Sequence, residues 1–247
     1  MCCYLCICKW DIWRSVLNAT YVLIESNWTL PVSEHNRDIW ILGSSLIKRA
    51  SEHVVSRPSG SQLGLEKSGH TVFWIGYGGM VWRMVETILR SMLTWRGPPE
   101  MLIIHCGEND IPTKQNGDLI FEIRQGLSIN MFLMPYSTII WSSILHRKEW
   151  RYANTNDAAE GTRKRVNRDV RRFLHKFNSK VIHHPDLEDL HPTLFNNDWV
   201  HLSYIGNDIF ISALQSALEF FISRPYIKPY PESWKQFGFI WCQLFVA

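Results

Sequence analysis

Several features that mark particular protein classes are missing from this sequence of 247 residues. No apolar run approaches the roughly 20 residues that cross a bilayer, so we expect no transmembrane segment. The N-terminus lacks a basic stretch followed by a clean apolar one, so we expect no secretory signal. The net charge of +3 is too small to predict a polyanionic partner by itself.

Cysteine is scarce and unevenly distributed. The positions are Cys2, Cys3, Cys6, Cys8, Cys106 and Cys242. Such clustering is not a disulfide framework spread over a secreted fold, so we expect a reducing compartment and a cytoplasmic protein. The N-terminal cluster could bind metal or carry palmitate, but no Cys or His pair follows at zinc-ligand spacing, which favours free thiols.

What is present is the composition of an ordinary globular protein, with 46% hydrophobic and 20% charged residues. Short apolar runs typical of buried strands alternate five times with segments of helical period. We expect strands over 39–43, 70–75, 101–106, 138–142 and 180–183, and helices over 45–56, 80–95, 117–130, 157–177 and 204–222. This alternation predicts an α/β domain over 37–223 with a five-stranded parallel sheet, an N-terminal extension over 1–36 and a tail over 224–247.

Residues that could take part in catalysis recur where the predicted strands end. Ser45, the glycine-rich loop 76–79 and Asn109 each follow a strand, and Asp198 and His201 lie in the loop after the fifth strand. Ligands bind at the carboxyl edge of such sheets, so we expect these residues to meet there.

Together these residues fit an acyl-transfer site. A serine at a helix N-terminus is a candidate nucleophile if a base reaches it, although most such serines only cap the helix. His201 could be that base, and Asp198, three residues earlier, could orient its ring. The N–H groups of Ser45 and Gly79 and the Asn109 amide could stabilise an oxyanion. Such chemistry needs neither metal nor organic cofactor.

Four short blocks in this order resemble those of the SGNH (GDSL-type) hydrolases. They are Gly-Ser-Ser-Leu at 43–46, Gly-Tyr-Gly-Gly at 76–79, Gly-Glu-Asn-Asp at 107–110 and Asp-Trp-Val-His at 198–201. The resemblance covers about 37–222 and implies a three-layer, flavodoxin-like sandwich and an esterase, lipase or acetylhydrolase activity. It implies Ser45 as nucleophile, Asp198 and His201 as its partners, and Asn109 with Gly79 (or Gly78) as oxyanion donors.

Two positions depart from that pattern. Ser44 stands where the family has an aspartate that shapes the turn, which puts the rigidity of the turn and the level of activity in question. Ile75 and Gly76 stand where the family often has an Asn-rich strand end. More narrowly, the stretches 141–147, 165–167 and 201–208 resemble the esterase-type domains of vertebrate transposon-derived proteins.

One expected helix is strongly basic, and this supports an alternative from another class. Its cations are Arg163, Lys164, Arg165, Arg168, Arg171, Arg172 and Lys176, opposed within the run only by Asp169. They could be a solvated helix face or a footprint for nucleic acid or anionic lipid. The sequence thus favours a serine esterase, with a non-catalytic nucleic-acid-binding domain as the alternative and an inactive relic as a third reading.

Overall fold

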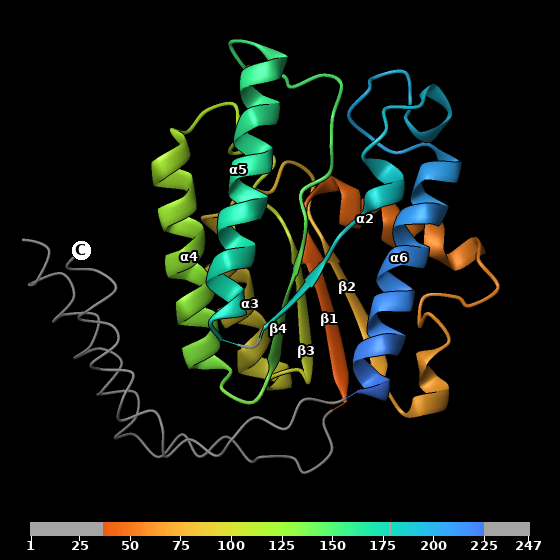
Figure 1. The fold of residues 1–247 in the computed structure, drawn as a ribbon. Helices are drawn as coiled ribbons and strands as arrows, with labels where there is room; N and C mark the ends of the chain where they lie inside the picture. The colour runs from red at the N-terminus through yellow and green to blue at the C-terminus, as the bar shows by residue number, and fades with distance from the viewer. Residues whose placement is uncertain (1–36, 178, 225–247) are drawn as a thin grey trace, which may run out of the picture. The chain divides into compact units, whose positions relative to one another are not determined.

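The computed structural model describes residues 37–177 and 179–224 (Figure 1). The expected extension 1–36, with its cysteines, and nearly all of the expected tail lie outside these residues. The strands are β1 (Asp38–Gly43), β2 (Thr71–Gly76), β3 (Met101–His105), β4 (Thr138–Ser142) and β5 (Lys180–Ile182). The α-helices are α2 (Ser45–His53), α3 (Met84–Arg96), α4 (Asn116–Leu133), α5 (Asn156–His175) and α6 (Tyr204–Ser223).

The strands form one parallel sheet in the order β2-β1-β3-β4-β5. This is the flavodoxin-like order, so the expected three-layer α/β sandwich is confirmed. The chain moves outward from β1 to β2 and then returns to place β3 on the other side of β1. Ligand sites in this topology lie at the carboxyl ends of the strands beside that reversal.

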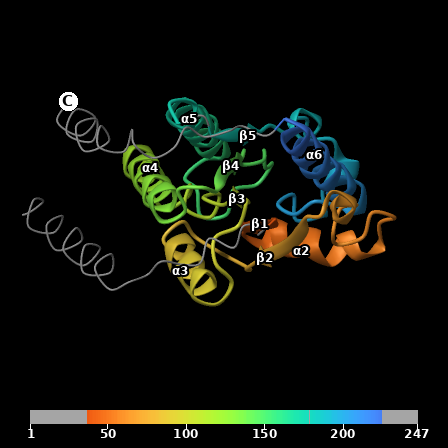
Figure 2. The ribbon, with the colours of Figure 1, turned by 90° about the horizontal axis from the view of Figure 1, so that it is seen from below.

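The sheet separates two hydrophobic cores, which explains why its central strands are apolar without alternation. On one face, Trp40 and Leu42 pack with α3, α4 and α5. On the other face, Ile39 and Ile41 pack with α2 and α6. Figure 2 shows the strands between these two helical layers. Both faces of β1 are therefore fully buried, and its end is held firmly.

The start of α3 differs from the expected helix, which began at residue 80. The N–H of Trp82 donates to the Asp110 carboxylate at 2.7 Å, and the carbonyl of Met80 accepts from the Asn109 amide at 2.9 Å. In a helix from residue 80, the Met80 carbonyl would accept the N–H of Met84. The Asn109 amide binds this carbonyl instead, and the Met84 N–H donates to the Val81 carbonyl at 3.0 Å, so α3 begins at Met84. Met80 and Trp82 are still buried, which accounts for their apolar pattern in the sequence.

Among the described helices, only α6 has the length and hydropathy of a membrane-crossing helix, with 20 residues and a mean hydropathy of 1.2. One of its faces contributes Phe210, Ile211, Leu214 and Leu218 to the core that it shares with α2 and the sheet. A helix that covers a sheet needs such an apolar face, so this composition follows from the packing.

Candidate active site

Ser45 is the first residue of α2 and follows β1 after one intervening residue. The turn is held on both sides: the N–H of Ser44 donates to the His105 carbonyl at 3.3 Å, and that of Tyr77 donates to the Gly43 carbonyl at 3.0 Å. A Cβ at residue 43 would lie 2.3 Å from the His105 oxygen, so only glycine permits this approach of β1 to β3. Ser45 is thus presented at a helix N-terminus, where free N–H groups favour negative charge.

Ser45, His201 and Asp198 form a continuous chain of hydrogen bonds. The Ser45 Oγ lies 3.1 Å from the His201 Nε2, although the two residues are 156 positions apart. The His201 Nδ1 lies 2.6 Å from the Asp198 Oδ2. When Nδ1 donates to the carboxylate, Nε2 is left as an acceptor for the serine hydroxyl. This is the geometry in which a histidine can take a proton from a serine.

Asp198 is fixed from two sides and is ionised at neutral pH. Its Oδ1 accepts the N–H groups of Val200 at 3.1 Å and His201 at 3.0 Å. Partial burial raises the pKa of Asp198, but the hydrogen bonds from His201 and Val200 outweigh it and lower the pKa to about 2. The carboxylate therefore stays charged beside a ring that would become cationic on accepting a proton.

The loop that carries His201 is fastened before α6 begins. Its two sides join where the N–H of Asn196 donates to the His201 carbonyl at 2.8 Å and that of Ser203 donates to the Leu194 carbonyl at 2.9 Å. Ser203 is also the N-cap of α6 and accepts the N–H of Gly206 at 3.1 Å. The position of the imidazole is therefore coupled to the start of α6.

The two other expected residues, Gly79 and Asn109, lie on adjoining loops. Gly79 has a φ of +68°, in the left-handed region that favours glycine. The Asn109 amide donates to the Met80 carbonyl, which joins the loop after β3 to the loop after β2. The Tyr77 hydrogen bond to Gly43 joins the second loop to the Ser45 turn. All five expected site residues thus follow strands at the carboxyl edge, but no hydrogen bond links Gly79 or Asn109 directly to Ser45 among the described residues.

Sequence reasoning missed Glu108, which takes part in the Ser45 turn. The Ser44 hydroxyl donates to its carboxylate, and the Glu108 side chain is fully buried. A carboxylate from the end of β3 therefore supports the turn at the position where Ser44 replaces an aspartate. Glu108 lies inside the block 107–110, but nothing in its local spacing indicates that it reaches back across the sheet to residue 44.

Arg147 is the cationic partner of this buried glutamate. Its Nη2 lies 3.6 Å from the Glu108 Oε1, and the side chain of Arg147 is only 7% exposed. Burial raises the pKa of Glu108 to about 7, and the opposing charge of Arg147 limits the rise. The Ser45 turn therefore rests on a buried carboxyl group, that of Glu108, which titrates near neutral pH.

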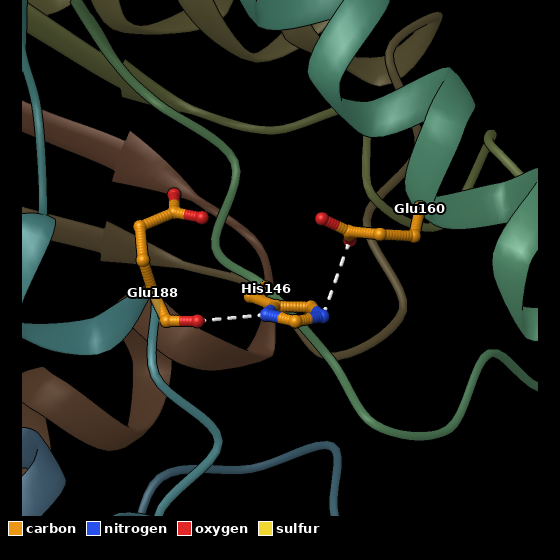
Figure 3. A group of neighbouring side chains, drawn as sticks. All are labelled: His146, Glu160 and Glu188. Atoms are coloured by element: carbon orange, nitrogen blue, oxygen red, sulfur yellow. Dashed lines mark hydrogen bonds and ion pairs between the residues drawn. The ribbon is translucent and has the colours of Figure 1, made fainter.

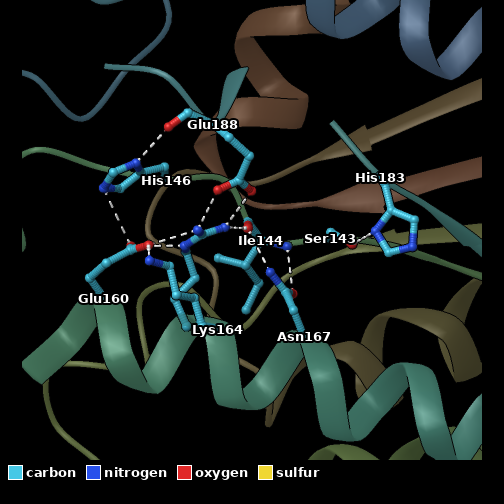
Figure 4. Close-up of polar contacts among 9 residues, drawn as sticks. Ser143, Ile144, His146, Glu160, Lys164, Asn167, His183 and Glu188 are labelled. Carbon is cyan, nitrogen blue, oxygen red and sulfur yellow. Dashed lines mark hydrogen bonds and ion pairs between the residues drawn. The ribbon is translucent and has the colours of Figure 1, made fainter. Parts of the chain in front are cut away.

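A group of three side chains near α5 has the spacing of cation ligands (Figure 3). His146, Glu160 and Glu188 bring ligand atoms within 4.8 Å of one another. Both carboxylates also bind the guanidinium of Arg163, at 2.7 Å from Glu160 and 2.6 Å from Glu188. Arg163 thus supplies the positive charge between these acids. Figure 4 shows the resulting network, which ties α5 to Ile144 after β4 and to the loop after β5.

The expected basic surface of α5 is divided by this packing. Arg163 is only 2% exposed, so its assignment to a nucleic-acid contact is wrong. Lys164 lies 3.5 Å from Glu160, and Arg172 lies 4.0 Å from Asp169. Part of the charge is therefore neutralised within the helix, and the run does not form one continuous cationic face.

No protein-family model and no curated protein sequence matches the chain. Solved structures do match it. A GDSL-like lipase from Bacteroides thetaiotaomicron VPI-5482 aligns at 15% identity and a TM-score of 0.57, covering 81% of this chain and 96% of that one. The lipase/acylhydrolase from Enterococcus faecalis aligns at 15% identity and 0.58, covering 78% and 100%.

The psychrotrophic esterase EstA from Pseudoalteromonas sp. aligns at 12% identity and a TM-score of 0.58, covering 76% of this chain and 100% of that one. That structure is described as inhibited by monoethylphosphonate. The TM-scores of 0.57 and 0.58 over most of each chain establish a shared fold. This chain therefore has the fold of GDSL-like lipases and esterases, as the four sequence blocks predict.

Proposed function

We propose that this protein is a serine hydrolase that cleaves carboxylic esters. The observation that carries the proposal is the hydrogen-bonded chain from Ser45 through His201 to Asp198 at the carboxyl edge of the sheet. The likeness to solved lipases and esterases supports the same reaction class. Acetyl and lipid esters are the substrate classes that follow from these resemblances.

The first half-reaction forms an acyl-enzyme. The Ser45 Oγ attacks the ester carbonyl carbon as His201 Nε2 takes its proton, and Asp198 stabilises the imidazolium. The tetrahedral oxyanion is stabilised by the N–H groups of Ser45 and Gly79 and by the Asn109 amide. The C–O bond to the alcohol then breaks, and His201 returns the proton to the leaving oxygen.

The second half-reaction restores the serine. His201 takes a proton from a water molecule, and the resulting nucleophile attacks the acyl carbon. Collapse of this second tetrahedral intermediate breaks the bond to Ser45 Oγ, which regains its proton from His201. The carboxylic acid leaves, and the ionised Asp198 has stabilised the imidazolium in both steps.

Labelling with a fluorophosphonate probe tests the proposal. An activated serine attacks phosphorus and displaces fluoride, which leaves a stable adduct on its Oγ. We expect the full chain to be labelled, Ser45→Ala to show no labelling, and Asp198→Asn and His201→Ala to be labelled at least about a hundredfold more slowly. Ser51→Ala, on the same helix, is the matched control and should be labelled normally.

Mass spectrometry of the labelled peptide identifies the modified residue. A folded chain that is never labelled, or labelling that survives in Ser45→Ala, contradicts the proposal. If Ser45 is labelled, hydrolysis rates for acetyl esters and for long-chain esters then separate the two substrate classes.

A further inference from the structure

A cavity of about 310 Å³ lies beside α5, separate from the Ser45–His201–Asp198 chain. Its wall combines one face of α5 with the segments that follow β4 and β5, so it opens at the carboxyl edge of the sheet. Its lining includes Ser143, Lys164, Arg168, Arg171, His183 and Glu188. The volume is at the small end of ligand pockets and suits a small ion or a compact organic molecule.

The charge of this cavity is strongly positive. Lys164, Arg168 and Arg171 are one helical turn apart or nearly so, and all three side chains are exposed. Arg168 and Arg171 have no ion-pair partner within the part of the chain that the structure describes. The lining carboxylate, Glu188, is occupied by Arg163 in bonds of 2.9 and 2.6 Å. Two guanidinium groups therefore face the cavity without a neutralising acid.

His183 adds a donor from the opposite side. Its Nδ1 lies 3.3 Å from the Ser143 Oγ, a pair visible in Figure 4. Burial and the nearby charge of Arg171 lower the pKa of His183 despite the opposing charge of Glu188, which favours the neutral ring. An anion in the cavity would offset the repulsion from Arg171 and provide an acceptor for the second ring nitrogen.

The floor of the cavity is rigid because Asn167 is fully engaged. Its Oδ1 accepts the N–H of Ile144 at 2.9 Å, and its Nδ2 donates to the carbonyl of the same residue at 2.9 Å. This bidentate contact locks α5 to the end of β4. The cationic side chains therefore project from a helix whose position relative to His183 is fixed.

We propose that this cavity binds a phosphate group, either free or as the monoester of a small molecule. Several acceptor oxygens on one tetrahedral centre can meet donors from Arg168 and Arg171 on one side and from His183 on the other. Guanidinium groups bind phosphate through paired charge-assisted hydrogen bonds. A concave site of this volume fits a compact anion better than a nucleic-acid backbone, which would need a continuous cationic face.

Calorimetric titration of the full chain with inorganic phosphate, at constant ionic strength, tests this site. We expect one saturable site whose affinity falls at least about tenfold in Arg168→Gln/Arg171→Gln. The matched control, Arg165→Gln/Arg172→Gln, removes the same charge from the same helix and should bind phosphate normally. If the first double variant does not fold by circular dichroism, His183→Asn takes its place and should show the same loss.

Two further titrations identify the ligand. Phenyl phosphate binding more tightly than inorganic phosphate identifies an organic monoester, and equal affinities identify the free ion. A single-stranded oligonucleotide is titrated in the same way. If it binds and its affinity falls equally in both double variants, the proposal is overturned in favour of polyanion binding along the helix.

Absence of saturable phosphate binding, or equal weakening in both double variants, also overturns the proposal. The result is independent of the proposed hydrolase because Ser45→Ala should retain phosphate binding in full.

Discussion

At the scale of single residues, Glu108 shows how burial changes chemistry. Its carboxyl group lies inside the protein, accepts the Ser44 hydroxyl and faces Arg147 at 3.6 Å. Burial raises its pKa to about 7, whereas Asp198, which is held by several hydrogen bonds, has a pKa of about 2. Below about pH 7, Glu108 is therefore mostly protonated whereas Asp198 stays ionised, and the surroundings of each carboxyl group cause this difference.

The raised pKa of Glu108 predicts a pH-dependent stability. Between its unfolded value of 4.5 and about 7, the folded protein keeps a proton that the unfolded chain releases. The free energy of unfolding should therefore fall as the pH rises through this window, by up to about 3 kcal/mol. Glu108→Gln cannot titrate and should lose this part of the dependence.

Urea unfolding of both proteins at about pH 5 and about pH 8 measures the effect. The stability of the natural chain relative to Glu108→Gln should decrease from the lower pH to the higher. A constant difference between the two proteins would show that Glu108 has an ordinary pKa.

At the scale of elements, the N-cap of α6 links the stability of this helix to the position of His201. Ser203 caps this helix through the N–H of Gly206 and also donates to the Thr193 carbonyl at 2.6 Å. His201 lies two residues before it, on the loop whose sides are joined by backbone hydrogen bonds. A change at this cap should therefore affect both the helix and the imidazole.

Ser203→Ala tests this coupling against a matched cap on another helix. Thr155 caps α5 by accepting the N–H of Ala158 at 3.2 Å. Each Ala variant should lose about 1 kcal/mol of unfolding free energy. Only Ser203→Ala should also slow fluorophosphonate labelling of Ser45, by about tenfold, because it loosens the His201 loop. Equal labelling rates in both variants would show that the cap and the site are independent.

At the scale of the whole described domain, one sheet joins two cores. Leu89 of α3 belongs to the core on one face, and Leu214 of α6 belongs to the core on the other. Both side chains are fully buried. Because the same strands contribute to both cores, neither core can be lost while the sheet remains intact, and the domain should unfold as one unit.

Leu89→Ala and Leu214→Ala test whether the two cores unfold together. Each should remove about 2–5 kcal/mol of unfolding free energy, since each leaves a cavity in a packed core. Near- and far-ultraviolet circular dichroism should report one coincident transition in both variants. Separate transitions in either variant would show that the two faces unfold independently.

Much of this architecture follows from local patterns in the sequence. The apolar runs and the glycine and proline breakers predict all five strands and the helices between them, because strand and helix periods are properties of neighbouring residues. The spacing of three between Asp198 and His201 likewise predicts their contact, which the structure has at 2.6 Å. The order of the strands follows from the fold that the four blocks resemble.

Tertiary structure alone decided which charged side chains are buried and which segments with a helical pattern form loops instead. Glu108 reaches Ser44 across 64 positions, Arg163 is enclosed between two acids, and α3 begins at residue 84 because the end of β3 binds the residues before it. Glu108 and Ser44 lie 64 positions apart, Arg163 and Glu188 lie 25 apart, and Asp110 and Trp82 lie 28 apart, so no local period records these contacts. Of the contacts named here, only the one between Arg163 and Glu160 is local, because these two residues are three positions apart on α5. Burial and long-range hydrogen bonds exist only once the sheet has brought the strand ends together.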